Sequence, residues 1–151
     1  MELETLQLGG VNFADRKTYA KVGENARLIV KEKISTDGEQ IAKTYFSVVL
    51  SGKKSFVDVS SRSVAKDRSS QKFVSRVVGK NECFGHVECD GILIDNAKIT
   101  SCPQIVAHSV DSTLVHEAAI GKIAGDQLTK LMSLGLTREQ AEKEIINSFM
   151  L

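Results

Sequence analysis

The sequence has almost no proline and few aromatic residues, and both absences narrow the choice of fold. One proline, no tryptophan and an aromatic content of 5% leave Val, Ile, Leu, Ala and Phe to build the core. Val and Ile in particular favour strands, because β-branched side chains pack well on a pleated surface. With 151 residues and 42% hydrophobic content, the chain has enough apolar surface for one domain, and we expect no second core.

No charge of one sign prevails in the chain, and no long hydrophobic run is present. Twenty basic against nineteen acidic residues give a formal charge of +1, so we expect no nucleic-acid partner. The longest apolar runs, such as residues 92–94, are far shorter than the roughly 20 residues that cross a bilayer. No signal peptide begins at Met1, so we expect a soluble, cytoplasmic protein without membrane contact.

Paired cysteines and known catalytic motifs are also missing. Cys83, Cys89 and Cys102 form an odd set without a C-x-x-C pair, which argues against a disulfide framework or a zinc knuckle. A lone cysteine is most often a small buried apolar residue. The chain has no P-loop, nucleophile elbow or H-E-x-x-H motif, so we predict no enzymatic activity and no catalytic residue.

Short strand-like segments fill most of the sequence. From about residue 22 to 120, stretches rich in Val, Ile, Phe and Thr are separated by Gly, Asn, Asp, Ser and Lys. The clearest candidates are residues 27–34, 44–50, 55–60, 72–78, 83–89 and 92–94. This spacing predicts an all-β core, but a sandwich, a barrel and a β-helix would all produce it. Residues 1–21 carry only weak signals.

The apolar pattern becomes helical near residue 124. Two sets of residues follow helical spacing: Leu128, Leu131 and Met132, then Ala141, Ile145 and Phe149. Gly135 stands where a left-handed cap would end the first helix, and Thr137 with Gln140 forms a capping box for the second. We therefore predict a β core over residues 1–123 and a two-helix, partner-binding segment over residues 124–151, within one structural domain.

Several separated motifs strongly resemble the C-terminal region of the SufB/SufD family. They are Val87-Glu-Cys-Asp-Gly-Ile-Leu-Ile94, Leu114-Val-His-Glu-Ala-Ala-Ile-Gly121, Asp126-Gln-Leu128 and Met132-Ser-Leu-Gly135, preceded by Arg62-Ser-Val-Ala-Lys66. The resemblance covers roughly residues 22–150. It implies a right-handed parallel β-helix, with rungs about 4.8 Å apart, that ends in a helical hairpin.

The resemblance also implies a function and a set of partners. SufB/SufD proteins are scaffolds on which iron–sulfur clusters are built, together with an ABC-type ATPase and sulfur donor proteins. The expected cofactor is a transient iron–sulfur cluster. Family members carry a long N-terminal region that this chain lacks, and an exposed rung would invite strand pairing. We therefore expect a homodimer, or pairing with a second SufB/SufD-type subunit.

Four residues are candidates for cluster or sulfur handling. Cys89 matches the family's cluster-forming cysteine, and a thiolate can accept sulfur as a persulfide and bind iron. His116 followed by Glu117 resembles SufB rather than SufD, and both are candidate metal ligands with Cys89. Adjacent strand residues face opposite ways, so we expect one ligand and one supporting residue unless the strand bulges. Cys102 is a candidate extra ligand with weaker family support.

Spacing and burial lead to two further expectations. The separation of Cys89 and His116 along the chain is close to one β-helical turn plus a loop, which would place them on neighbouring rungs.

Two short helices cannot bury all their apolar residues against each other, so part of that surface must meet the β core or a partner. The resemblance marks this hairpin as the ATPase-docking segment, with these expected contacts: Leu128, Leu131, Met132, Ile145 and Phe149.

Two alternatives to a cluster-holding scaffold stay open at this point. A SufD-like structural subunit would anchor the ATPase without binding iron. An unrelated small β-domain would bind a ligand through its loops, and a sandwich or barrel structure would favour it.

Overall fold

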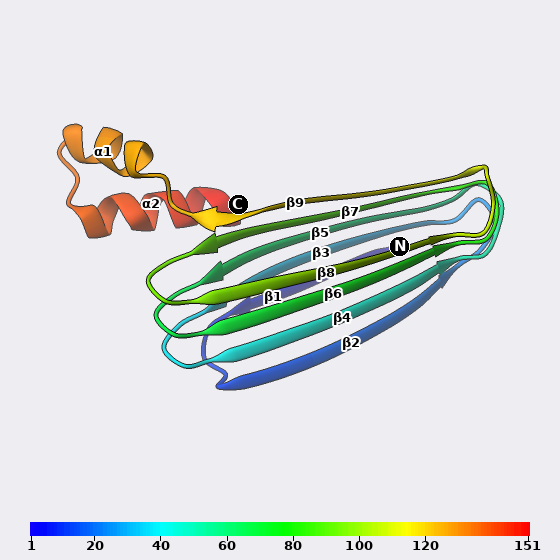
Figure 1. Ribbon diagram of the computed structural model, residues 1–151, viewed down its shortest axis with the longest axis horizontal. Helices are drawn as coiled ribbons and strands as arrows, with labels where there is room; N and C mark the ends of the chain where they lie inside the picture. Colours follow the sequence, from blue (N-terminus) through cyan, green and yellow to red (C-terminus); the bar gives the residue numbers. More distant parts are fainter.

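Nine strands and two helices make up the computed structural model, which describes all of residues 1–151 (Figure 1). The strands are β1 (Glu2–Leu8), β2 (Phe13–Val22), β3 (Arg27–Thr36), β4 (Ile41–Leu50), β5 (Ser55–Ala65), β6 (Ser70–Gly79), β7 (Cys83–Leu93), β8 (Lys98–Ala107) and β9 (Ser112–Lys122). The helices are α1 (Gly125–Ser133) and α2 (Arg138–Met150).

The chain winds between two parallel sheets. One has the order β1-β3-β5-β7-β9 and the other β2-β4-β6-β8, and every neighbouring pair is parallel. Figure 1 shows the two sheets as long layers joined by turns at both ends. The predicted parallel β-helix is confirmed, as a solenoid of about four turns followed by two helices.

Successive turns of the solenoid take a nearly constant length of chain, and this keeps their side chains aligned. Val30 of β3 lies opposite Val59 of β5 in the next turn, and Val59 lies opposite Val87 of β7 in the turn after that. All three are buried members of the hydrophobic core. Because successive strands stack in register, the alternation of inward and outward side chains is carried from turn to turn.

The turns stack as regularly as the strands. At one end of the solenoid, Gly38, Asp67 and Asp95 adopt φ values of 56°, 61° and 58°. Glycine and aspartate are among the residues that tolerate this left-handed conformation best. The Lys66 N–H donates to the Thr36 carbonyl at 2.9 Å, so the hydrogen-bond ladder continues into the turn.

The predicted strands are confirmed, and most are longer than expected. The segments predicted at 83–89 and 92–94 form one strand, β7, and residues 1–21 contain β1 and nearly all of β2. The signals in β1 and β2 are weak because several inward positions are polar. These positions hold Thr5, Gln7, Arg16 and Thr18, opposite buried residues of β3 and β4.

Both predicted helices are present, and their ends have the predicted caps. Gly135 adopts a φ of 97° after α1, and its N–H donates to the Met132 carbonyl at 3.0 Å. At the start of α2, the Gln140 N–H donates to Thr137 Oγ1 at 3.2 Å, and the Thr137 N–H donates to Gln140 Oε1 at 2.8 Å. The local sequence therefore determines where these helices begin and end.

Two cations from the five-stranded sheet hold the C-terminal end of α2. Lys33 Nζ donates to the Leu151 carbonyl at 2.7 Å, and Arg62 Nη1 donates to the Phe149 carbonyl at 3.1 Å. Carbonyls at a helix C-terminus lack intrahelical partners and carry partial negative charge, so cations stabilise them. These bonds fix the hairpin against one end of the solenoid (Figure 1). Neither helix is long and apolar enough to span a membrane.

We predict that Gly52 is a position where one methyl group disturbs the stacked turns. A Cβ at Gly52 would clash with the backbone of Gly23 and Glu24 in the preceding turn. The Gly52→Ala variant should therefore lose about 1–3 kcal/mol of its free energy of unfolding, as is typical of overpacking. Urea denaturation followed by far-ultraviolet circular dichroism measures this loss.

Gly23→Ala is the matched control. A Cβ at Gly23 has no other atom within 4 Å, and neither glycine has a φ in the left-handed region. The control should change the free energy of unfolding by no more than about 0.5 kcal/mol. Equal denaturation midpoints for the two variants would contradict the close contact between these turns.

Candidate functional site

A column of inward polar residues crosses three turns of the five-stranded sheet. Glu32 of β3 lies opposite Ser61 of β5, which lies opposite Cys89 of β7, and all three side chains are buried. Ser61 Oγ donates to Glu32 Oε1 at 3.0 Å. The column therefore leads from a buried carboxyl group to a buried thiol.

The carboxyl group of Glu32 is satisfied inside the solenoid. Thr44 Oγ1 donates to Glu32 Oε2 at 2.8 Å, and Arg16 Nη2 lies 3.7 Å from the same oxygen. Burial has the largest effect and raises the pKa of Glu32, while the Thr44 hydrogen bond, the Arg16 charge and the Ser61 hydrogen bond lower it. Polar partners from both sheets thus converge on this carboxyl group.

Cys89 stands at the C-terminal end of the column and is only 2% exposed. Burial is the main cause that raises the pKa of its thiol, and the negative charges of Glu32 and Asp90 raise it further. The nearby Ser101 hydroxyl, from β8 in the facing sheet, acts in the opposite direction and lowers the pKa. At neutral pH the folded protein therefore holds Cys89 as the thiol rather than the thiolate.

His116 of β9 lies on the same inner face as Cys89, one strand further along. Val87 is opposite His116, and Cys89 is opposite Ala118, so the histidine and the cysteine are diagonal neighbours. The His116 Nε2 atom is buried and has no hydrogen-bond partner. Burial lowers the pKa of His116, and the charge of His86 lowers it further, which favours the neutral imidazole that binds metals.

Glu117 lies on the opposite side of β9 from His116. It follows His116 directly, and its register partner is Glu88 on the outward side of β7. The pairing of β9 with β7 is continuous from Ser112 to Lys122, so no bulge turns Glu117 inward. The structure therefore does not bring Glu117 to the inner face that holds Cys89.

Cys102 also faces outward, on the four-stranded sheet. Its register partner is Val74, whereas the preceding Ser101 lies opposite the buried Phe73. Of the four predicted residues, the structure brings only Cys89 and His116 together on the inner face. No three His, Cys, Asp or Glu side chains of the chain are grouped closely enough to hold a metal ion.

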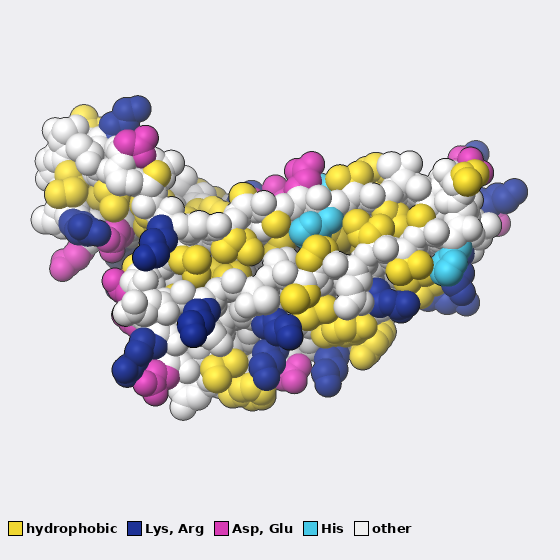
Figure 2. Space-filling model, in the orientation of Figure 1, with side chains coloured by type: hydrophobic (Ala, Val, Ile, Leu, Met, Phe, Trp, Pro, Cys, Tyr) yellow, Lys and Arg dark blue, Asp and Glu magenta, His cyan; other side chains and the backbone are white.

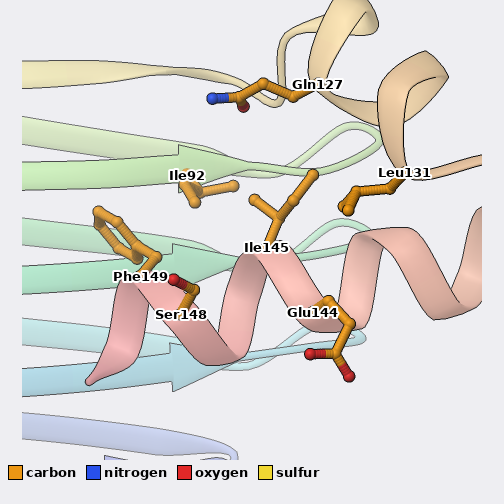
Figure 3. Close-up of a pocket in the computed structure, with 7 residues that line it drawn as sticks. All are labelled: Ile92, Gln127, Leu131, Glu144, Ile145, Ser148 and Phe149. Carbon is orange, nitrogen blue, oxygen red and sulfur yellow. The ribbon is translucent and has the colours of Figure 1, made fainter. Parts of the chain in front are cut away.

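Three of the five predicted partner-binding residues line a cavity beside the helical hairpin. Figure 3 shows Leu131, Ile145 and Phe149 converging with Ile92 of β7 around this cavity of about 520 Å³. Leu128, Ile145 and Phe149 are half-buried, and the Met132 side chain is 45% exposed. Apolar surface is therefore left uncovered on the hairpin.

A family model described as "SUF system FeS cluster assembly, SufBD core domain" matches residues 1–149. The chain belongs to the SufBD family. This membership confirms the resemblance seen in the sequence, to a family whose members are described as iron–sulfur cluster assembly proteins.

Several archaeal SufBD relatives are similar along most of this chain. A SufBD family protein of Methanothermobacter thermautotrophicus is 32% identical over 130 residues, which cover 85% of this chain and 32% of the relative. One of Archaeoglobus fulgidus is 34% identical over 147 residues, 95% of this chain and 39% of the relative. One of Pyrococcus horikoshii is 30% identical over 132 residues, 87% of this chain and 40% of the relative. This SufBD chain therefore spans about a third to two fifths of these relatives.

The strand register explains why Cys89 and His116 of this SufBD chain share the inner face. One full turn leads from Val87 to His116, and Cys89 stands two positions after Val87 on the same strand. A difference of two positions keeps both side chains on the inner face, because side chains alternate with a period of two. The same spacing makes Cys89 and His116 diagonal rather than direct neighbours.

Sequence reasoning missed the polar residues that surround Cys89, although one of them left a signal. Glu32 stands between Val30 and Ile34 at a position that the alternating pattern reserves for buried side chains. A charged residue in such a place indicates a buried, hydrogen-bonded carboxyl group. Ser61 and Ser101 left no comparable signal, because serine is common on both faces of strands in this sequence.

We predict that Cys102 reacts with iodoacetamide at least about tenfold faster than Cys89 at neutral pH, because burial suppresses thiolate formation. Cys102 is half-buried, whereas Cys89 is buried and its thiol pKa is raised. Labelling of Cys89 should continue to rise above the ordinary thiol pKa of about 8.5. Peptide mass spectrometry after timed labelling gives both rates.

Labelling in concentrated urea is the control, since unfolding should make the two rates similar. Similar rates in the folded protein would contradict the burial of Cys89.

Proposed function

We propose that the chain is a non-enzymatic scaffold subunit on which an iron–sulfur cluster is assembled and from which it is passed on. The observation that supports this most is the placement of Cys89 and His116 on one inner face, with an unpartnered buried nitrogen on the histidine. Thiolate and imidazole both bind iron. In this proposal the cluster is cargo, with Cys89 as its main ligand and His116 as the second.

Cys89 can also receive the sulfur from which the cluster is built. A Cys89 thiolate would attack the outer sulfur of a persulfide on a sulfur donor protein. The donor's S–S bond breaks as the new S–S bond forms, so Cys89 becomes a persulfide and the donor leaves as a thiolate. The exchange needs no further oxidant or reductant, and it requires the thiolate form of Cys89.

The position of Cys89 supports access from the C-terminal edge of the solenoid. β9 is the last strand of its sheet, and the residue opposite Cys89 is Ala118, whose side chain is a single methyl group. Only one edge strand therefore separates the thiol from that edge. A shift of β9, or a partner that binds there, would expose Cys89.

The proposal includes a second subunit at this edge. Iron–sulfur clusters usually have four protein ligands, more than the Cys89 and His116 pair supplies. β8 and β9 end their sheets and carry unpaired backbone groups that favour strand addition. A second SufB/SufD-type subunit, or a second copy in a homodimer, would supply further ligands beside Cys89.

We predict that Cys89→Ala abolishes cluster formation. The purified chain, reconstituted without oxygen with ferrous iron and sulfide, should bind both and show the visible absorption of iron–sulfur clusters. The variant should lose most of the bound iron and sulfide, because no other thiol occupies the inner face beside His116. Iron and sulfide assays and light scattering on the reconstituted sample give the cluster content and the number of chains.

Cys83→Ala is the control, since Cys83 is also buried on β7 but lies outside the proposed site. It should retain the cluster. Full cluster content in the Cys89 variant would refute the proposed ligand. A chain that binds no iron but binds the ATPase would instead be the SufD-like structural subunit.

We propose further that the helical hairpin docks an ABC-type ATPase. The exposed Met132 and the apolar cavity between α1, α2 and β7 support this, because grooves of this kind accept apolar side chains of a partner. The bonds from Lys33 and Arg62 to the end of α2 would hold the docking surface rigid against the solenoid.

We predict that deletion of residues 137–151 abolishes binding of the ATPase while the β-helix stays folded. Met132→Glu should weaken binding at least about tenfold, because a charge would be buried in the interface. Binding of the purified ATPase, measured by calorimetry, tests both variants. Circular dichroism tests the fold.

Asn147→Glu is the matched control, since it adds the same charge at an exposed position of α2. It should bind with nearly unchanged affinity. Undiminished binding by the truncated chain would refute the assignment of the hairpin.

A further inference from the structure

The outward side chains of the four-stranded sheet carry almost one sign of charge. Six basic residues face outward on β2, β4, β6 and β8: Lys17, Lys21, Lys43, Lys72, Arg76 and Lys98. The only acidic residue on these strands is Asp15. We call this surface the basic face, and Figure 2 shows its dark-blue side chains along the solenoid.

The net charge of the chain does not reveal the excess of positive charge on the basic face. It holds six of the twenty basic residues but only one of the nineteen acidic residues. The remaining surface therefore has an excess of acidic residues, although the whole chain has a formal charge of +1. Such a separation of charge produces a local field that the net charge does not reveal.

The cations of the basic face form no salt bridge within the chain, since none of the five salt bridges of the protein includes one of them. Lys43 lies opposite Asp15 on one neighbouring strand and opposite Lys72 on the other, and the second is a pairing of like charges that destabilises a sheet. Their charge is therefore available to another molecule.

The outward side of the five-stranded sheet has a different arrangement. There Lys31 Nζ lies 2.6 Å from Glu2 Oε1, and His86 Nδ1 lies 2.9 Å from Asp58 Oδ1. Outward side chains of both signs occur on those strands, and some of them pair, although Lys33 lies opposite Arg62 and Glu88 lies opposite Glu117. The single sign of charge is therefore particular to the basic face and does not follow from the solenoid geometry.

The aromatic side chains of the basic face favour a protein partner over a nucleic acid. Tyr19 is 70% exposed, but its ring packs against Tyr45 with centroids 5.6 Å apart, and the Lys43 ammonium lies 5.4 Å from the Phe13 centroid. Single-stranded nucleic acids stack successive bases on open ring faces. Here the rings already contact other side chains, whereas aromatic residues of this kind are enriched at protein interfaces.

The type of cation indicates a brief rather than a long-lived complex. Five of the six basic residues are lysines, which are hydrated point charges and lack the planar, bidentate contacts of arginine. Lysine is depleted in tight interfaces, but exposed charge speeds the encounter of oppositely charged proteins. We propose that the basic face is a docking surface for a protein with an acidic surface, which binds transiently and leaves.

This inference goes beyond the proposed function, because neither the inner face with Cys89 nor the helical hairpin contributes to the basic face. Its test is therefore separate from cluster formation and from ATPase binding. A failure of either of those proposals would leave it intact.

A fluorescent peptide of ten glutamates, titrated with the full chain, tests the basic face. We expect binding that weakens between about 50 and 200 mM salt, since salt screens exposed charges. The triple variant Lys43→Glu, Lys72→Glu and Arg76→Glu should weaken it at least about tenfold. The matched control, Lys53→Glu, Lys80→Glu and Lys122→Glu, makes the same change of charge at exposed positions off this face and should retain most of the affinity.

Two further probes test whether the basic face binds nucleic acid or membrane rather than an acidic protein. They are a single-stranded oligonucleotide of ten thymidines and vesicles that contain an anionic phospholipid. If either bound more tightly than the peptide and lost binding in the basic-face variant, the surface would recognise nucleic acid or membrane, and the proposal would be wrong. Equal loss of peptide binding in both triple variants would also overturn it, since only overall charge would then matter.

Discussion

The stacking of each strand on the strand one turn earlier is the constraint on which the rest of this molecule depends. Every strand is paired with a parallel neighbour one full turn away in the sequence, and the turns continue the same ladder. A slip of one residue would turn the apolar side chains of a strand outward, so burial of these side chains holds each strand in register. The position of each side chain is therefore determined by partners that are distant in the sequence.

This constraint separates chemistry on the inside from recognition on the outside. On the inner face it aligns Glu32, Ser61 and Cys89, and it places His116 one strand further along. Burial there keeps the cysteine protonated and the histidine neutral. On the outer face the same ladder places lysines from separate turns side by side. One repeated geometry thus gives two environments of opposite character.

The helical hairpin extends the solenoid without closing it. Lys33 and Arg62 hold the end of α2 against the outward side of the five-stranded sheet, while β8 and β9 remain the last strands of their sheets. The C-terminal edge therefore stays available for strand addition, next to the two successive turns that contain Cys89 and His116. The proposed cluster site and the proposed docking segment lie at neighbouring parts of the fold but use different surfaces.

The sequence by itself determined the features that depend on near neighbours along the chain. The capping box of Thr137 and Gln140, the glycine cap at Gly135 and the alternation within most strands all follow from residues a few positions apart. The motifs around Cys89 and His116 identified the family, which the comparison confirmed. The choice of a β-helix came from that resemblance, since the spacing of strands fits several all-β folds.

Only the tertiary structure decided what depends on register. It placed Glu117 and Cys102 on outward faces and brought Glu32 and Ser101 close to Cys89. It also collected the lysines of four strands on one surface. The physical reason is that these juxtapositions join residues that lie a full turn apart in the sequence or in facing sheets. Local propensities carry no information about the length of a turn, and an error of one residue exchanges the inside of the solenoid with the outside.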